Sequence, residues 1–393
     1  MIDYHLLLSV FIGVAVLVFL ILKFKMQPFL GLLISSILVG ILAGVPPLEI
    51  MATVKQGMGS TLGFVAVVVG LGAMFGAILE HSGGAEALAQ YLLKAFGEKN
   101  ASWALMITGF FIAIPVFFDV AFIILIPLVY SLQRKTKKSL LLYAIPLLAG
   151  LAITHAFIPP TPGPVAVADI LNADLGWVIL VGFIVGVPTA IISGPIFGKF
   201  IASKIFIAAP KIIDEKAVSN FPPISLILII IGTPILLIVL NTLLNSSISS
   251  GLNWSKTTIA WIQMIGHPFS ALIIANLMAW YLLGIRRGVS KTILSKITSA
   301  SLAPAGIIIL LTGAGGVFKQ MLITTGTGEM LANYFSSIGL NLLLFAFLAA
   351  VTVRILQGSS TVAMITAAGI TSSLITSPLG EFHTALILSL IHI

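Results

Sequence analysis

Apolar runs of about 20 residues recur along the whole chain, and a run of that length is what a helix needs to cross the hydrocarbon core of a membrane. Short polar stretches separate these runs. The pattern predicts membrane-spanning helices at residues 5–24, 28–44, 61–80, 140–172, 175–198, 223–245, 267–285 and 303–323. The chain is therefore expected to be an all-α integral membrane protein.

Two further apolar stretches, 101–132 and 341–370, are too long for a single span, and each carries polar residues with glycine or proline near its middle. We interpret both as re-entrant hairpins, in which two half-helices enter and leave the membrane on the same side. Irregular backbone at membrane depth is tolerated where protein or a watery cavity surrounds it.

The predicted span 140–172 is interrupted by THAFIPPTPGPVAV at residues 154–167. Proline removes a backbone donor and clashes with the preceding helical turn, so we expect one half-helix to end near residue 158 and another to begin near 165. Prolines 159, 160, 162 and 164, together with Gly163, would hold the backbone between them open. Broken helices of this kind coordinate substrate in transporters.

Composition agrees with a membrane protein, because 59% of the residues are hydrophobic, only 8% are charged, and the mean hydropathy is +1.18. A soluble domain carries about 25% charged residues. The chain has no cysteine, which excludes disulfides and thiolate chemistry.

The basic residues predict the topology. With the N-terminus outside and both hairpins non-crossing, 16 of the 20 basic residues lie inside, as the positive-inside rule requires. They are Lys23, Lys25, Lys94, Lys99, Arg134, Lys135, Lys137, Lys138, Lys199, Lys204, Lys211, Lys216, Arg286, Arg287, Lys291 and Lys296. Lys55 and Lys256 lie outside, and Lys319 and Arg354 fall within the membrane. Lys319 is deep in a helix, yet within snorkelling reach of the outer interface.

The chain also contains an internal repeat. QPFLGLLISSIL (27–38) resembles HPFSALIIANLM (267–278), and residues 70–89 align without gaps to 313–332 with eight identities in twenty positions. The predicted topology runs 28–44 and 267–285 in opposite directions. We therefore expect an inverted repeat, with an N-terminal half at 1–222 and a C-terminal half at 223–393; such repeats are typical of secondary transporters.

Asp119 and His155 are the candidate proton-coupling residues. Asp119 lies in the middle of the first hairpin, where a carboxylate is costly and usually functional; alternatively, it caps the second half-helix, and both roles can coexist. His155 stands beside the helix break, and imidazole titrates near neutrality. A buried histidine with satisfied hydrogen bonds is the alternative.

The second hairpin carries the candidate anion site. A polar tip followed by a helix offers free backbone donors to an anion, and the planar guanidinium of Arg354, one turn earlier, matches a carboxylate. The tip residues are Gln357, Gly358, Ser359, Ser360 and Thr361. A serine-rich kink that only packs helices together is the alternative.

Three motifs, IPVFFDVAFIILIPLV (114–129), THAFIPPTPGPVAVA (154–168) and VRILQGSSTVAMITAAGI (353–370), resemble the gluconate permease family, within a wider superfamily of organic-anion transporters. The resemblance covers nearly the whole chain. It implies import of gluconate or a related sugar acid with a proton, by an elevator-type dimer in the bacterial cytoplasmic membrane. It implies a site lined by Asp119, Thr154, His155, Thr161, Gly163, Arg354, Gln357, Gly358, Ser359, Ser360 and Thr361. No catalytic residue, metal, cofactor or nucleic-acid partner is expected.

The second half has no counterpart to the interrupted helix and the span that follow the first hairpin. Members of this family continue with a second broken helix, whereas here the chain stops at EFHTALILSLIHI. We therefore expect the second repeat to be truncated.

Three other functions fit parts of the pattern. A sodium-coupled carrier for citrate-like or lactate-like acids would use the same broken helices, because open carbonyls bind sodium as readily as substrate. An intramembrane enzyme built on His155 and Asp119 would need a nucleophile–base pair or a metal motif, and the sequence has neither. A passive anion channel would carry out no uptake against a gradient.

Overall fold

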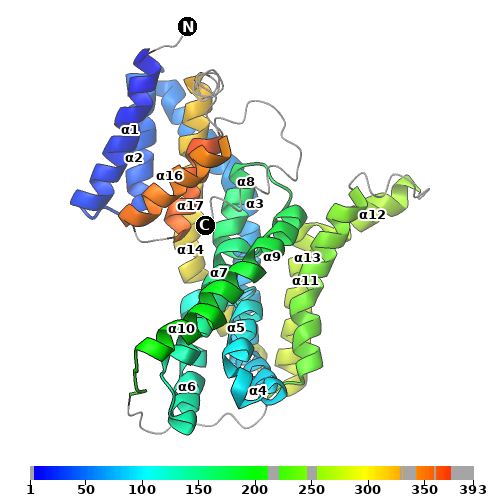
Figure 1. The fold of residues 1–393 in the computed structure, drawn as a ribbon. Coiled ribbons are helices and arrows are strands. Elements are labelled where there is room, and N and C mark those ends of the chain that lie inside the picture. The colour runs from blue at the N-terminus through cyan, green and yellow to red at the C-terminus, as the bar shows by residue number, and fades with distance from the viewer. Residues whose placement is uncertain are drawn as a thin grey trace. The chain divides into compact units, whose positions relative to one another are not determined.

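The computed structural model describes residues 4–210, 221–245, 255–327, 330, 342–357 and 360–372, and every regular element within these ranges is a helix (Figure 1). The expectation of an all-α chain is confirmed for these residues. The chain divides into two compact units, of which unit 1 comprises Met1–Val69, Pro162–Val178 and Pro304–Ile393, and unit 2 comprises Gly70–Thr161 and Ile179–Ala303.

Seven helical stretches in the described part of the chain are long and apolar enough to cross a membrane. They are Tyr4–Lys23, Pro47–His81, Leu141–Ile170, Leu175–Lys204, Ile224–Asn245, Pro268–Arg287 and Lys291–Thr324. Each corresponds to a predicted span. The eighth prediction, 28–44, falls on a shorter apolar helix, Pro28–Leu42.

Two of these helices begin well before their predicted starts. Helix α3 (Pro47–His81) has 35 residues instead of starting near 61, and α14 (Lys291–Thr324) has 34 residues instead of starting near 303. Polar side chains in the first turns lower the local hydropathy without disfavouring a helix. At 1.5 Å per residue α3 is about 50 Å long, which exceeds a hydrocarbon core of about 30 Å.

Unit 1 contains the N-terminal part of α3 and the C-terminal part of α14. Its other helices are α1 (Tyr4–Lys23), α2 (Pro28–Leu42), α8 (Pro162–Ile170), α16 (Leu342–Gln357) and α17 (Ser360–Ser372). Helix α1 packs on α2, and α17 packs on both α16 and α8. The Ser35 hydroxyl donates to the carbonyl of Gly13 at 2.5 Å, which joins α2 to α1.

Unit 2 contains most of the remaining helices. They are α4 (Gly84–Phe96), η1 (Glu98–Asn100), α5 (Ala101–Ile112), α6 (Phe118–Thr136), α7 (Leu141–Phe157), α9 (Leu175–Ile191), η2 (Ile192–Ile196), α10 (Phe197–Lys204), α11 (Ile224–Asn245), α12 (Lys256–Gly266), α13 (Pro268–Ala279), η4 (Trp280–Gly284) and η5 (Ile285–Arg287). The unit-boundary positions fall inside α3, α9 and α14.

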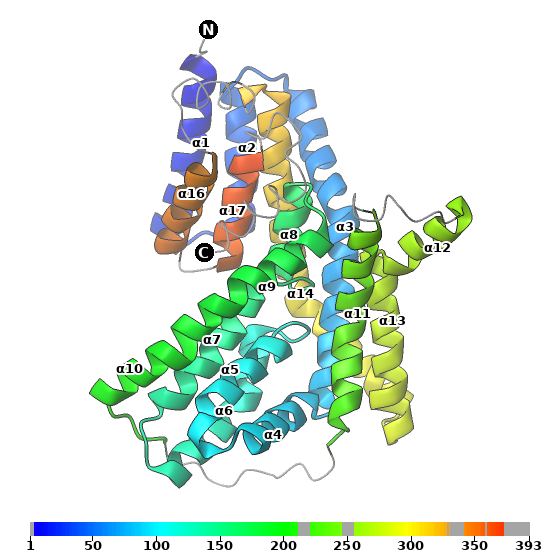
Figure 2. The same ribbon diagram turned by 45° about the vertical axis from the view of Figure 1, so that its right-hand side comes forward.

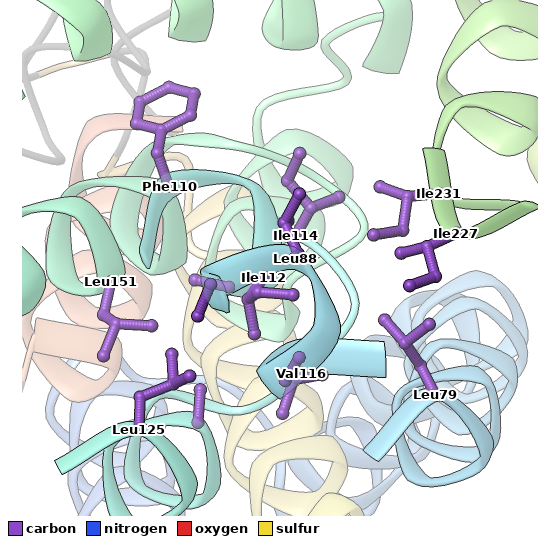
Figure 3. Packing of buried hydrophobic residues seen from close by; sticks show 14 of the residues in the cluster. Leu79, Leu88, Phe110, Ile112, Ile114, Val116, Leu125, Leu151, Ile227 and Ile231 are labelled. Carbon is purple, nitrogen blue, oxygen red and sulfur yellow. The ribbon is translucent and has the colours of Figure 1, made fainter. Parts of the chain in front are cut away.

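The core of unit 2 is built on close packing of α5 against α7, which lie side by side in both ribbon views (Figures 1 and 2). Glycine makes this approach possible, because a Cβ at Gly109 would lie only 2.6 Å from the carbonyl oxygen of Leu147. Figure 3 shows Ile112, Ile114 and Val116, at the end of α5 and in the turn after it, within the same apolar cluster.

The first expected hairpin has a helix, a break and a second helix, and the second has two helices separated by residues 358–359, which lie outside the described residues. In the first, α5 ends at Ile112 and α6 begins at Phe118; in the second, α16 ends at Gln357 and α17 begins at Ser360. Helices α16 and α17 pack against each other (Figure 2). Their re-entrant path through a membrane stays a prediction, as does the division into halves at 1–222 and 223–393.

Segments that match in sequence share local geometry. Gln27 and His267 are N-caps that accept from the backbone N–H two residues on, and each precedes a proline at the first helical position. Gly83 and Gly326 both adopt the left-handed region, with φ of 74° and 68°. The repeated sequence therefore specifies the same helix start and the same glycine turn twice.

Candidate functional site

The break between α7 and α8 comprises only Ile158–Thr161. Helix α7 ends at Phe157, the Pro159–Pro160 peptide bond is cis, and α8 begins at Pro162. The prediction that the second half starts near 165 was wrong, because proline is well tolerated in the first turn of a helix. Pro162, Gly163 and Pro164 therefore belong to α8 and not to the open backbone.

Two buried polar atoms at the end of α7 have no hydrogen-bond partner among the described residues: the hydroxyl of Thr154 and Nδ1 of His155. Thr154 is fully buried. By contrast, the Thr161 hydroxyl donates to the carbonyl of Ile158 at 2.5 Å, within the break. Buried polar groups are normally paired, so two unpaired ones in adjacent residues mark a place where a ligand can supply the missing bonds.

Asp119 lies in electrostatic range of His155, and both belong to unit 2. Asp119 is an exposed residue in the first turn of α6, where the helix dipole favours a negative charge. Phe117 is the N-cap and makes no side-chain cap bond. The fold thus places the two candidate proton-coupling residues within electrostatic range of each other, and their role in coupling stays a prediction.

Two glycines of α3, Gly72 and Gly76, lie beside the two breaks of unit 2, and neither was among the predicted site residues. A Cβ at Gly76 would overlap the carbonyl oxygen of Pro115 in the first hairpin, and one at Gly72 would lie 3.4 Å from the carbonyl oxygen of Pro160. Residues four apart share one face of a helix. Small residues at this spacing are typical of close helix contacts, so the sequence did contain a signal for the close approach of α3 to these breaks.

The remaining predicted residues lie in unit 1. Arg354 is exposed near the end of α16, and Ser360 and Thr361 are half-buried in the first turn of α17. Gly358, Ser359 and the side chain of Gln357 lie outside the described residues. The proposed anion site at this tip therefore stays a prediction.

Gly163 has a clear packing role in unit 1. A Cβ at this position would lie 2.5 Å from Cε of Met364 in α17. The absence of a side chain lets the first turn of α8 approach α17. Its role in lining a substrate site stays a prediction.

Seven apolar helices in the described part of the chain, together with a broken helix that has buried unpaired polar groups beside its break, are typical of multi-pass membrane transport proteins. The sequence of the chain matches the GntP family permease over residues 5–391, and the chain belongs to this family. It is therefore a permease and not an enzyme.

The relatives are bacterial proteins. The chain is 41% identical to the "Low-affinity gluconate transporter" of Escherichia coli K12 over 360 residues, which cover 91% of this chain and 80% of the relative. It is 38% identical to the "Gluconate permease" of Pseudomonas aeruginosa, with 94% and 82% covered, and 37% identical to that of Bacillus subtilis, with 93% and 83% covered.

Among solved structures, the chain is similar to the YdaH transporter of Alcanivorax borkumensis, which is described as having an unusual topology. The TM-score is 0.53 at 15% identity, with 81% of this chain and 72% of the transporter covered. This likeness concerns the fold alone.

Proposed function

We propose that this chain imports gluconate or a closely related sugar acid by proton symport across the bacterial inner membrane. The observation that carries the proposal is the pair of unpaired buried atoms on Thr154 and His155, beside a helix break and in electrostatic range of Asp119. The identity of the substrate is inferred from the relatives, which are named as gluconate transporters and permeases.

The two candidate groups of residues would have different tasks. His155 and Asp119 would exchange the coupling proton, since imidazole is the side chain whose charge changes nearest to neutral pH. Thr154, Thr161 and the open backbone of the break would bind the hydroxyls of the sugar acid. The carboxylate would bind Arg354, the backbone donors at the start of α17 and the tip residues Gln357, Gly358, Ser359, Ser360 and Thr361.

The proposed architecture is an inverted repeat with two re-entrant hairpins, the N-terminus outside and two chains forming a homodimer. Its supports are the distribution of basic residues and the matched helix starts at Gln27 and His267. An inverted repeat gives alternating access by exchanging two equivalent arrangements of the same elements around one site.

The test is uptake of labelled gluconate into proteoliposomes under an imposed inward proton gradient. Wild-type protein is expected to accumulate gluconate, and a proton ionophore is expected to abolish the accumulation. H155N and D119N should lose proton-driven accumulation but keep exchange of gluconate across the membrane. T154V should lower the uptake roughly 10-fold, the effect of losing one hydrogen bond of about 1.4 kcal/mol.

The matched control is T108V, because the Thr108 hydroxyl is also buried but donates to the carbonyl of Ala104 at 2.8 Å. It should transport normally. Accumulation driven by a sodium gradient and not by protons would replace the proposal with the sodium-coupled alternative. Equilibration without accumulation would indicate a passive channel.

A further inference from the structure

Lys319 in α14, which the sequence places deep in a membrane-spanning helix, makes a specific contact. Its ammonium donates to the carbonyl oxygen of Ile170, the last residue of α8, at 2.5 Å. The two residues are 149 positions apart in the chain, and both lie in unit 1. A charged side chain inside a membrane-spanning helix usually has a function.

The contact completes the C-terminus of α8. Three of the last four carbonyls of this helix accept backbone N–H groups, in the pairs Leu171 to Val167, Ala173 to Ala168 and Asn172 to Asp169. Asn172, with φ of 52°, provides the left-handed turn that makes this capping possible. The carbonyl of Ile170 is the fourth, and it accepts from Lys319.

The surroundings of this ammonium would suit a small cation. The carboxylate of Asp169 interacts electrostatically with Lys319, and the C-terminus of a helix carries partial negative charge. Carboxylate and carbonyl oxygens are the ligands of hard cations. In transporters with broken helices, the C-terminal ends of half-helices coordinate sodium.

The packing of α14 brings the lysine to this position. One turn earlier on the same face, a Cβ at Gly315 would lie 2.5 Å from Ile365 of α17 and 3.5 Å from Ile170. In the alignment of the two repeated segments Gly315 corresponds to Gly72, whereas Lys319 corresponds to Gly76. The glycine is therefore present in both repeated segments, whereas the charged side chain four residues later occurs only in the second segment, as Lys319.

We propose that Lys319 is a tethered cation that occupies a monovalent cation site at the C-terminus of α8. The ammonium takes the place of a sodium ion and holds α8, which carries Gly163 in its first turn, without any dissolved cation. One consequence is that transport does not require sodium, and this consequence rests on the proposed function.

Thermal unfolding of the purified protein in detergent tests the site without any transport. The salts are sodium chloride, methylammonium chloride and N-methylglucamine chloride, at equal ionic strength. Wild-type protein should have the same midpoint in all three. K319M should unfold roughly 1–2 °C lower in N-methylglucamine, the shift that a change of about 1 kcal/mol produces in a chain of this length, and sodium or methylammonium should restore most of the loss.

Two controls separate the site from general effects of charge. K319R keeps a cation at the site, and K296M removes an exposed lysine from the same helix; both should behave as wild type. The double variant K319M/D169N should lose the restoration by sodium. Where K319M does not give folded protein, K319Q keeps a donor without a charge and should show the same gain in sodium.

A K319M midpoint equal to wild type in all salts would overturn the proposal. So would a lowered midpoint that neither small cation restores, because the lysine would then act only as a hydrogen-bond donor. Failure of proton-driven gluconate uptake would overturn the proposed function and leave these midpoints unaffected. In uptake, K319M should become sodium-dependent while the wild type does not.

Discussion

Buried threonine hydroxyls show, at the scale of single residues, which polar groups the fold satisfies by itself. Those of Thr108, Thr298 and Thr312 donate to the carbonyl four residues earlier, as hydroxyls in helices commonly do. Those of Thr154, Thr366 and Thr371 are buried and make no such bond. Thr154 differs from the other two because it lies beside a helix break. For this reason we propose that Thr154, and not every buried threonine, binds the substrate.

Glu86 gives a prediction about stability and pH. Burial raises the pKa of this carboxyl, in the first turn of α4, above its ordinary value of 4.5, and one of its oxygens is buried without a partner. Because the folded state disfavours the ionised form, ionisation lowers stability as the pH rises from 4.5 through the folded-state pKa. E86Q should therefore unfold at a higher temperature than wild type near pH 7.

The gain should be on the order of 1–2 °C and should shrink toward pH 4, where the wild-type carboxyl is also neutral. Thermal unfolding across this pH range measures it. The control is E98Q, which removes an exposed ion pair with Lys135 of the kind that contributes little, so its midpoint should change little. An E86Q gain that is equal at pH 4 and pH 7 would refute the argument from burial.

The helix elements were predictable where a residue type restricts the backbone directly. The break near Pro159 and Pro160 follows from the lost donors of proline, and the helix start at Pro28 follows from the preference of proline for the first helical position. The starts of α3 and α14 were not predictable from hydropathy, because polar residues such as Glu49 and Lys55 lower the hydropathy without ending a helix.

The α5–α7 contact gives a prediction about an element. A Cβ at Gly150 would overlap the carbonyl oxygen of Met106 and lie 2.8 Å from the backbone nitrogen of Phe110. Backbone atoms cannot move aside as a flexible side chain can, so G150A should cost about 1–3 kcal/mol, as overpacking does. The thermal midpoint in detergent should fall by several degrees.

The matched control for this prediction is G63A. Gly63 is also helical, in α3, but nothing lies within 4 Å of a Cβ built on it. Because alanine favours helix over glycine, this variant should be as stable as wild type or slightly more so. Equal midpoints for G150A and G63A would mean that α5 and α7 are not in close contact.

At the scale of the whole molecule, the internal repeat could be found in the sequence, but the contacts between distant segments could not. The glycines at 83 and 326 are identical in the aligned segments, and the structure shows that both adopt the left-handed region. The bond from Lys319 to Ile170 could not be found this way, because it joins residues 149 positions apart whose sequences carry no mark of the pairing. Likewise, the approach of Asp119 to His155 depends on how α6 and α7 pack.

The re-entrant path of the first hairpin can be decided by labelling, because the chain has no cysteine and any single introduced thiol is unique. Helix α5 has 12 residues and is about 18 Å long, too short to cross a hydrocarbon core of about 30 Å. Exposed lysines flank the hairpin at Lys99 and Lys138. K99C and K138C should therefore both react with an impermeant maleimide from the cytoplasmic side only.

K55C is the reference for the opposite side, since Lys55 is exposed and predicted to lie outside. It should react in intact cells, whereas K99C and K138C should react only in inside-out vesicles. Labelling of K99C and K138C from opposite sides would show that the segment between them crosses the membrane. Every later span would then reverse direction, and the positive-inside partition would fail. The segments 28–44 and 267–285 would run parallel, and the chain would lack the inverted repeat on which the proposed alternating access depends.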